Sequence, residues 1–207
     1  GTYQTLITKD PVTTGGVTID TFASESVSAV KYFITATDAS SNSQTDILVV
    51  STDGTNVGHA VNGTVHATGT TDFVTYNASI SSGVVTVTAT ASDNVTKLKA
   101  HRMAILATET DTTATVNSNQ SAFAKQYTSD GATAITVYEL DTSSYRGAEI
   151  FVTVSDGTSN ETSQIYIGYN GSNPFITTYN VVAADGSASR NTFTVTHSGS
   201  TLSLQLV

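Results

Sequence analysis

Two stretches of the chain carry one strand pattern and decide the fold: VKYFITATD at residues 30–38 and AEIFVTVSD at residues 148–156. They lie 118 residues apart (156 − 38 = 118), and their apolar positions coincide. In the first stretch the apolar positions are Tyr32, Ile34 and Ala36, each separated by one residue of mixed character. This period of two predicts a β-strand with one apolar face and one mixed face.

The 118-residue offset extends outward from these two stretches. It lays residues 17–22 over 135–140 and residues 46–50 over 164–168, with their apolar positions in phase. We place a one-residue deletion at the turn that follows, after which the offset is 117 to the end of the alignment. We interpret the chain as a tandem duplication, the pattern that repeat architectures leave in sequence.

The duplication divides the chain into a lead-in segment at residues 1–16, a first repeat at 17–107, a connecting segment at 108–134 and a second repeat at 135–207. The connecting segment has Val116, Phe123 and Tyr127 as apolar anchors. Both it and the lead-in segment could be linkers or an extra strand pair.

Residues 95–106 are the predicted closing strand of the first repeat, and the second repeat has no counterpart. A module without its last strand has an open sheet edge. Two explanations are open: the chain is a piece of a longer protein, which we favour, or a strand arrives from another chain.

Thr and Val dominate the apolar runs and favour strands, while good helix formers are scarce. Asp53-Gly54 and Asn170-Gly171 are hairpin signals between strands, and we expect type I′ turns there. We therefore predict an all-β chain of two tandem immunoglobulin-like β-sandwich modules with antiparallel strands. A small barrel is the alternative.

Composition excludes several classes of function. The chain has 207 residues, a net charge of −9 and 12% charged residues, whereas nucleic-acid binding requires a basic stripe. No apolar run is long enough to span a membrane as a helix. There is no cysteine, so thiol and disulfide chemistry are absent.

No pattern of catalytic or metal-binding residues stands out, and we predict no enzyme activity, cofactor or metal site. His59, His66, His101 and His197 lack the spacing of metal ligands. We expect His59 and His66 to be polar loop residues, and His101 lies on the predicted closing strand. The repeat-equivalent Asp38 and Asp156 are either Ca²⁺ ligands or, as we favour, turn formers whose side chains bond their own backbone.

Aromatic residues suggest two surfaces. Phe33, Phe151 and Tyr166 lie on the mixed strand faces, where we expect a contact between repeats or subunits. A second group surrounds a turn of the second repeat and could bind a sugar or a partner protein, because tyrosine combines a flat ring with a hydroxyl group. That group is Tyr169, Phe175 and Tyr179.

The duplicated segments resemble the tandem repeats of virion structural proteins in marine T4-like tailed phages such as cyanophages. In the second repeat the matching segments are YELD at 138–141, SYRGA at 144–148 and VSDGTSN at 154–160. In the first repeat they are ILVV at 47–50, DGT at 53–55, ISSG at 80–83 and KLKAHR at 97–102. The first repeat departs from the family at Val27-Ser28, where the family has Tyr-Arg, and the second lacks the closing Lys-x-x-Arg strand.

The resemblance implies a structural component of a phage virion, in a tail fibre, neck, baseplate or head decoration. Its expected partners are other virion proteins and further copies of itself. The alternative is a carbohydrate-binding adhesin module that recognises a polysaccharide on the host surface.

Overall fold

The structure, a computed structural model, describes residues 4–67, 71–92, 96–107, 112–117, 120–124, 133–189 and 191–207. In these residues all regular secondary structure is β-strand, and every strand pairing is antiparallel. This confirms the prediction of an all-β chain with antiparallel strands.

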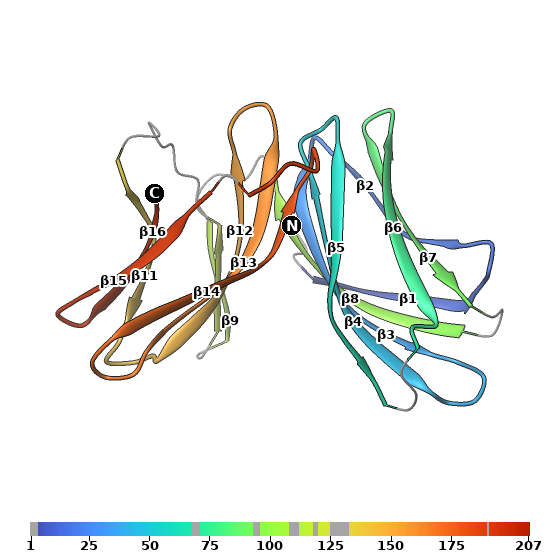
Figure 1. The fold of residues 1–207 in the computed structure, drawn as a ribbon, viewed down its shortest axis with the longest axis horizontal. Helices are drawn as coiled ribbons and strands as arrows, with labels where there is room; N and C mark the ends of the chain where they lie inside the picture. The colour runs from blue at the N-terminus through green and yellow to red at the C-terminus, as the bar shows by residue number, and fades with distance from the viewer. Residues whose placement is uncertain are drawn as a thin grey trace.

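The first eight strands form two sheets that enclose one core (Figure 1). The larger sheet has the order β1-β8-β3-β4-β5 and the smaller one the order β2-β7-β6. The strands of the larger sheet are β1 (Gln4–Val12), β8 (Thr96–Leu106), β3 (Val27–Thr37), β4 (Ser43–Thr52) and β5 (Val57–His66). Those of the smaller sheet are β2 (Val17–Ala23), β7 (Val84–Ala91) and β6 (Val74–Ser81).

The first core forms because strands of both sheets alternate apolar and polar residues. Tyr32, Ile34 and Ala36 of β3 are fully buried, as the period of two predicts. From the smaller sheet, Val85 and Val87 of β7 meet them and are equally buried. Burial of this apolar area is the main favourable term that holds the two sheets together.

The last six strands form two three-stranded sheets around a second, smaller core (Figure 1). The sheet orders are β11-β16-β15 and β12-β13-β14. Buried residues such as Leu140, Ile165 and Leu202 form this core. The strands are β11 (Ile135–Asp141), β12 (Gly147–Ser155), β13 (Asn160–Tyr169), β14 (Pro174–Ala183), β15 (Phe193–Ser198) and β16 (Thr201–Leu206).

A hairpin of β9 (Thr112–Asn117) and β10 (Gln120–Ala124) lies between the two groups of strands in the chain. The anchors Val116 and Phe123 fall in these strands, although their side chains are outside the described part of the structure. Tyr127 lies outside the described residues altogether.

Strand positions in the two groups follow the offset found in the sequence. β2 and β11 begin at Val17 and Ile135, 118 residues apart (135 − 17 = 118). β5 and β14 begin at Val57 and Pro174, 117 residues apart (174 − 57 = 117). The pairing orders also correspond, since β2-β7-β6 matches β11-β16-β15 and β3-β4-β5 matches β12-β13-β14.

Irregularities in the sheets recur at matching positions too. The register shifts between Thr18 and Asp20 in β2, and between Thr136 and Tyr138 in β11. A second shift, in the β4–β5 pairing, contains Gly63, and its counterpart in the β13–β14 pairing contains Asn180. Both residues have a positive φ, +68° and +54°, which glycine and asparagine tolerate best. The two groups of strands therefore share these bulge positions as well as their pairing orders.

The register corrects the alignment made from the sequence. Lys31 pairs with Val49, whereas Glu149, the counterpart of Lys31, pairs with Tyr166. The offset between β4 and β13 is therefore 117 (166 − 49 = 117), and the deletion lies one turn earlier than predicted, between β3 and β4. A slip of one residue exchanges the two faces of a strand, so only the corrected offset lays buried Leu48 over buried Ile165.

The turns at Asp53-Gly54 and Asn170-Gly171 connect strands as expected, but their type differs from the prediction. The positive φ falls on Gly54 and Gly171 alone, the first central position of each turn. That is the pattern of a type II′ turn, because a type I′ turn has a positive φ at both central residues. The Asp53 Oδ1 atom accepts the N–H groups of Thr55 and Asn56, which closes the turn.

A buried carboxylate links both sheets of the first group. The Asp46 carboxylate on β4 accepts hydrogen bonds from Tyr76 Oη at 2.8 Å, Gln44 Nε2 at 2.8 Å and Thr64 Oγ1 at 2.7 Å. Burial, together with the charge of Asp46, raises the pKa of the Tyr76 hydroxyl, which therefore remains a donor. In the second group Phe193 takes the place of Tyr76, while buried Ser163 and Glu161 take the places of Asp46 and Gln44.

We predict that Tyr76→Phe destabilises the protein by about 1–3 kcal/mol, because it removes one donor from a fully buried carboxylate. Urea unfolding followed by circular dichroism measures this change. The control is Tyr145→Phe at an exposed ring. An unchanged urea midpoint for Tyr76→Phe would show that the Asp46 network does not stabilise the fold.

Candidate assembly interface

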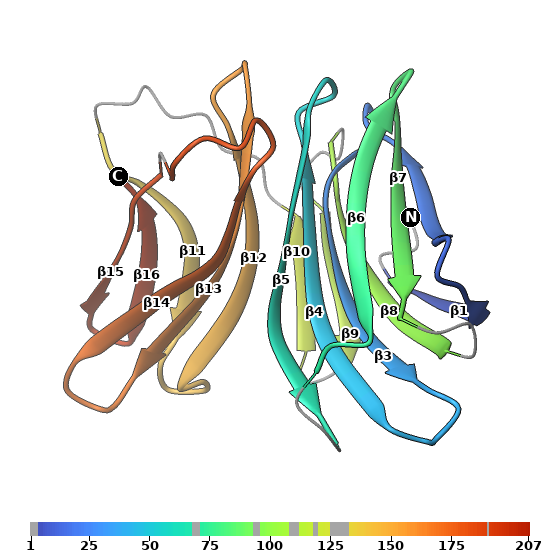
Figure 2. The same cartoon turned by 45° about the vertical axis from the view of Figure 1, so that its right-hand side comes forward.

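The sheets β3-β4-β5 and β12-β13-β14 lie next to each other, and β4 and β5 contact β13 and β14 (Figures 1 and 2). Val49 on β4 is fully buried although it is not part of the first core, because it is on the opposite face from Leu48 and Val50. Thr162 on β13 is likewise fully buried and outside the second core. These strands are therefore covered on both faces, and the contact joins the outer faces of the two sheets.

Small polar groups make the buried hydrogen bonds of this contact. Thr162 Oγ1 donates to Ser51 Oγ at 2.8 Å, and both side chains are fully buried. Asn160 Nδ2 donates to the backbone carbonyl of Thr52. Because polar groups that leave water need partners, these bonds fix how the two sheets lie against each other.

A glycine allows β5 and β14 to lie close together. Gly58 on β5 faces Ala183 on β14, and a Cβ atom at Gly58 would lie 2.3 Å from the Ala183 carbonyl oxygen. The φ angle of Gly58 is not positive, so the requirement for glycine here is one of space. Any side chain at this position would push β14 away from β5.

A charge pair joins equivalent positions of the two repeats. Lys31 Nζ lies 2.5 Å from Glu149 Oε1, and the two residues are 118 apart in the chain. They occupy matching places in β3 and β12, so corresponding faces meet with opposite charges. The Lys31 side chain is largely buried, whereas that of Glu149 is 38% exposed.

Glu149 is held by several further groups. Gln164 Nε2 donates to its Oε1 atom at 2.7 Å, and Asn180 Nδ2 in turn donates to Gln164 Oε1. Burial raises the pKa of the Glu149 carboxyl, but the hydrogen bond and charge of Lys31, with bonds from Gln164 and Tyr166, outweigh burial and leave the pKa below its usual value. Glu149 is therefore ionised when it faces Lys31.

The residues predicted for an assembly interface lie on these outer faces but toward their margins. Phe33 remains 52% exposed and Tyr166 45% exposed, while Phe151 is half-buried. Tyr166 stacks on Tyr179, with ring centroids 5.0 Å apart. The fully buried positions of the contact are instead small or aliphatic, and sequence reasoning missed Val49, Ser51 and Thr162.

The three aromatics proposed for sugar or partner contact do not form one platform. Tyr169 stacks on His197 at 4.0 Å, and its hydroxyl donates to the Gly171 carbonyl at 2.8 Å. Phe175 is 55% exposed and covers Gly168 on the neighbouring strand. Tyr179 is half-buried beside Glu149.

The histidines lie apart from one another in the fold. His59 and His101 are exposed on β5 and β8, His66 lies 3.0 Å from Asp72 Oδ1, and His197 packs on Tyr169. His59 and His66 are strand residues, contrary to the loop placement expected for them, whereas His101 lies on a strand as predicted. Among the described residues, no three His, Cys, Asp or Glu side chains are grouped as a metal site requires.

Asp38 and Asp156 both close turns with their carboxylates. Asp38 Oδ1 accepts the N–H groups of Ser40 and Asn42. The side-chain hydrogen bond from Asn42 is the largest influence on the Asp38 carboxyl, and with the backbone bonds it lowers the pKa. Asp156 Oδ1 accepts from the backbone of Thr158 and Ser159. In the structure, Asp38 and Asp156 both have the turn-forming role.

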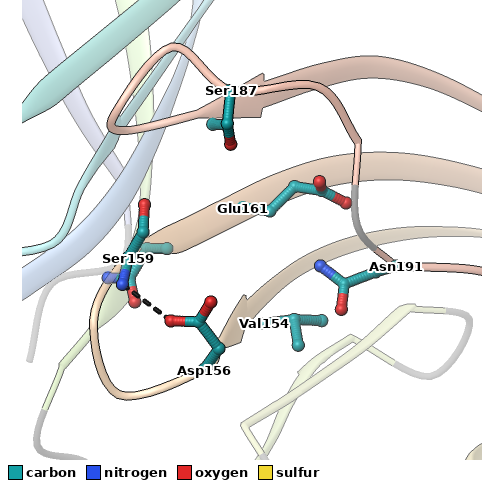
Figure 3. A pocket seen from close by; sticks show the side chains of 8 residues that line it. Val154, Asp156, Ser159, Glu161, Ser187 and Asn191 are labelled. Atoms are coloured by element: carbon teal, nitrogen blue, oxygen red, sulfur yellow. Dashed lines mark hydrogen bonds between the residues drawn. The ribbon is translucent and has the colours of Figure 1, made fainter.

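A shallow hollow lies between the β12–β13 turn and the segment after β14 (Figure 3). Its volume is about 30 Å³, room for one or two water molecules. Asp156, Ser159, Glu161 and Asn191 are among its lining residues, and Asp156 is committed to its turn. A hollow of this size cannot bury a small-molecule substrate, for which pockets of several hundred Å³ are usual.

No helix in the described part of the chain has the length and apolarity of a membrane span. Comparisons of the chain with protein-family models, with curated proteins and with solved structures found no match.

We predict that Gly58→Ala loosens the contact between the two sheets, because the new methyl group meets a backbone oxygen that cannot move aside. The expected cost is about 1–3 kcal/mol, typical of overpacking. Hydrogen exchange should show faster deuterium uptake in β4 and β13. Gly15→Ala is the matched control, since its Cβ atom would meet only the Thr13 hydroxyl at 3.9 Å. Equal uptake in both variants contradicts the prediction.

We also predict that Lys31→Met raises the pKa of Glu149, because it removes the cation that keeps this carboxylate ionised. Since the folded pKa lies below the unfolded value of about 4.3, the stability that the pair contributes is complete above that pH and is lost as pH falls through the folded pKa. NMR titration of the side-chain carboxyl carbon measures the shift. Lys97→Met, whose partner is Asp10 at 3.1 Å, should leave Glu149 unchanged.

Proposed function

We propose that this chain is a structural protein that acts through protein–protein assembly, built from two tandem immunoglobulin-like β-sandwich modules. The observation that carries the proposal is the contact between equivalent outer faces, which buries Val49, Ser51 and Thr162 and pairs Lys31 with Glu149. A module whose outer face is shaped to bind its own counterpart is suited to forming arrays.

The immunoglobulin-like assignment is supported by strand order. In immunoglobulin domains strands B, E and D are neighbours in one sheet, and F, C, C′ and C″ follow one another in the other sheet. β2-β7-β6 has the first order and β8-β3-β4-β5 the second, in the same sequence along the chain. β1 takes the place of strand G beside β8.

A role in a virion is supported by the strand-and-turn segments that resemble the repeats of phage virion proteins. The chemistry of the surface is compatible with such a role. The described residues include turns closed by their own side chains and an exposed aromatic ring, Phe33, on the outer face of β3. The proposed partners are further virion proteins and other copies of the chain.

The proposal is tested on particles. Mass spectrometry of purified particles of the phage that encodes the chain should detect it at a copy number matching a repeated component, and antibodies against it should label intact particles. Infected-cell lysate that has been cleared of particles is the control fraction. A chain that occurs only in the cleared lysate would rule out the virion role.

A second function, recognition of a surface polysaccharide, is favoured by one observation. Phe175 and Tyr166 are both about half exposed on the same face of the β13–β14 pair. Exposed apolar residues that lie together on one face mark binding sites, whereas single ones do not. As an adhesin the chain would bind host polysaccharide on a glycan array, and Phe175→Ala would weaken the signal at least about tenfold if this ring is a hot spot.

The control for the array is Phe33→Ala, which removes an equally exposed ring from the first group of strands. If the wild-type chain binds no glycan, or if both variants lose binding to the same degree, the adhesin proposal fails while the assembly proposal stands.

A further inference from the structure

An amine and a side-chain amide meet on one carboxylate at the contact between the two sheets. Glu149 Oε1 lies 2.5 Å from Lys31 Nζ and accepts a hydrogen bond from Gln164 Nε2 at 2.7 Å. The amine belongs to β3 of the first group of strands, and the amide belongs to β13 of the second. Because both nitrogens contact the same oxygen atom, the Lys31 amine lies beside the Gln164 amide.

The carbonyl end of the same amide also has a partner. Asn180 Nδ2 on β14 donates a hydrogen bond to Gln164 Oε1. Gln164 is fully buried and Asn180 nearly so, and this bond is therefore shielded from bulk water. A buried donor aimed at a carbonyl oxygen stabilises the negative charge that develops there when a nucleophile attacks the carbonyl carbon.

The backbone is distorted where β14 presents this donor. Asn180 has a φ of +54° at the bulge in the β13–β14 pairing, a conformation that is uncommon for residues other than glycine. The matching bulge of the first group has Gly63, and Ile47 stands at the place of Gln164 (164 − 117 = 47). The first group therefore forms the bulge with neither the amide nor its donor, so these side chains are not required for the bulge itself.

We propose that this site forms an isopeptide bond between Lys31 and Gln164, which links the two groups of strands covalently. The inference goes beyond the proposed assembly function and does not depend on it. Glu149 takes a proton from the Lys31 ammonium group, and the neutral amine attacks Cδ of Gln164. The Nζ–Cδ bond forms and the Cδ–Nε2 bond breaks. Two protons pass from Nζ through Glu149 to Nε2, which leaves as ammonium, so no oxidant or other reactant is needed.

Three features of the site favour this reaction. The folded contact holds the amine next to the amide, which replaces an encounter between separate molecules. Glu149 Oε1 contacts both nitrogens, so one carboxylate can serve as general base and then as general acid. The Gln164 amide is buried, and water therefore competes poorly with the amine as the nucleophile.

Peptide mapping of the full chain tests the proposal. The purified chain is incubated at neutral pH, denatured, digested with trypsin and analysed by mass spectrometry. Trypsin does not cleave after a lysine whose amine has become an amide. The link should therefore give residues 10–97 joined to residues 147–190, with the loss of one ammonia, and the yield of this product should rise with incubation time.

Loss of ammonia does not by itself identify the link. Asn62-Gly63 and Asn170-Gly171 can each close to a succinimide, which also releases ammonia but joins no peptides. If the loss maps only to these Asn-Gly pairs, the proposal is overturned. Recovery of residues 10–31 and 147–190 solely as separate peptides would overturn it as well.

Matched variants separate the reaction from packing. Lys31→Arg keeps a cation beside Glu149 but has no amine, so it should form no link. Glu149→Gln removes the proton carrier and should slow the reaction at least about a hundredfold. Asn180→Gly places the residue of the matching bulge here and removes the donor to the carbonyl oxygen, which should slow the reaction by about a hundredfold. Lys97→Arg is the control and should react at the wild-type rate.

Circular dichroism establishes that each variant is folded before rates are compared. A joined peptide that forms equally fast in Glu149→Gln and Asn180→Gly would contradict the roles given to these side chains. Absence of the link in the wild-type chain overturns this inference alone, because the assembly function is tested separately on particles.

Discussion

The arrangement of the chain depends on covering the outer face of β4. Residues 47–50 of β4 form an unbroken apolar run, so the strand has no polar face to present to water. Leu48 and Val50 pack in the first core. Val49 lies on the opposite face of β4 and must be buried by another layer of the structure. β13 and β14 provide it, through the hydrogen bond between Thr162 and Ser51 and the close packing of Gly58 against Ala183. Burial on both faces is the pattern of a strand between two layers.

The two groups of strands share a pairing order but differ in the side chains that fill their cores. Both retain the bulges at matching places, marked by the positive φ of Gly63 and Asn180. The first group carries buried polar networks, around Asp46 and around Asp20, whose carboxylate accepts from Tyr32 at 2.6 Å and faces Arg102 at 2.8 Å. The second group has apolar residues at several of these places. Buried networks of this kind favour one register over others, while apolar cores tolerate more change.

The sequence predicts the alternating strands because their period of two follows directly from pleat geometry. Strand β1 and the position of the deletion could not be settled in this way. The lead-in segment contains a proline and fits a linker as well as a strand. Because β4 has apolar residues on both faces, the alternation pattern leaves its alignment with the second repeat ambiguous by one residue.

Two features of the sequence could have predicted the interface between the two sheets. One was the apolar run at residues 47–50, which is too long for a strand with one face exposed to solvent. The other was the opposite charge of Lys31 and Glu149 at equivalent positions. No sequence feature indicates the roles of Gly58 and Thr162. The need for space at Gly58 and for a hydrogen-bond partner at Thr162 arises only when the two sheets meet. The aromatic residues predicted for the interface, among them Phe33 and Tyr166, lie at the margin of the contact and remain exposed.

The most direct test of the account is a cross-link at the centre of the contact. Ser51 Oγ and Thr162 Oγ1 are 2.8 Å apart, so Ser51→Cys with Thr162→Cys, refolded in a glutathione redox buffer, should close an intramolecular disulfide bond. We expect nearly all monomers to contain it, with faster migration in non-reducing electrophoresis. A variant that remains reduced, or that links only to other chains, would contradict the packing of the two outer faces.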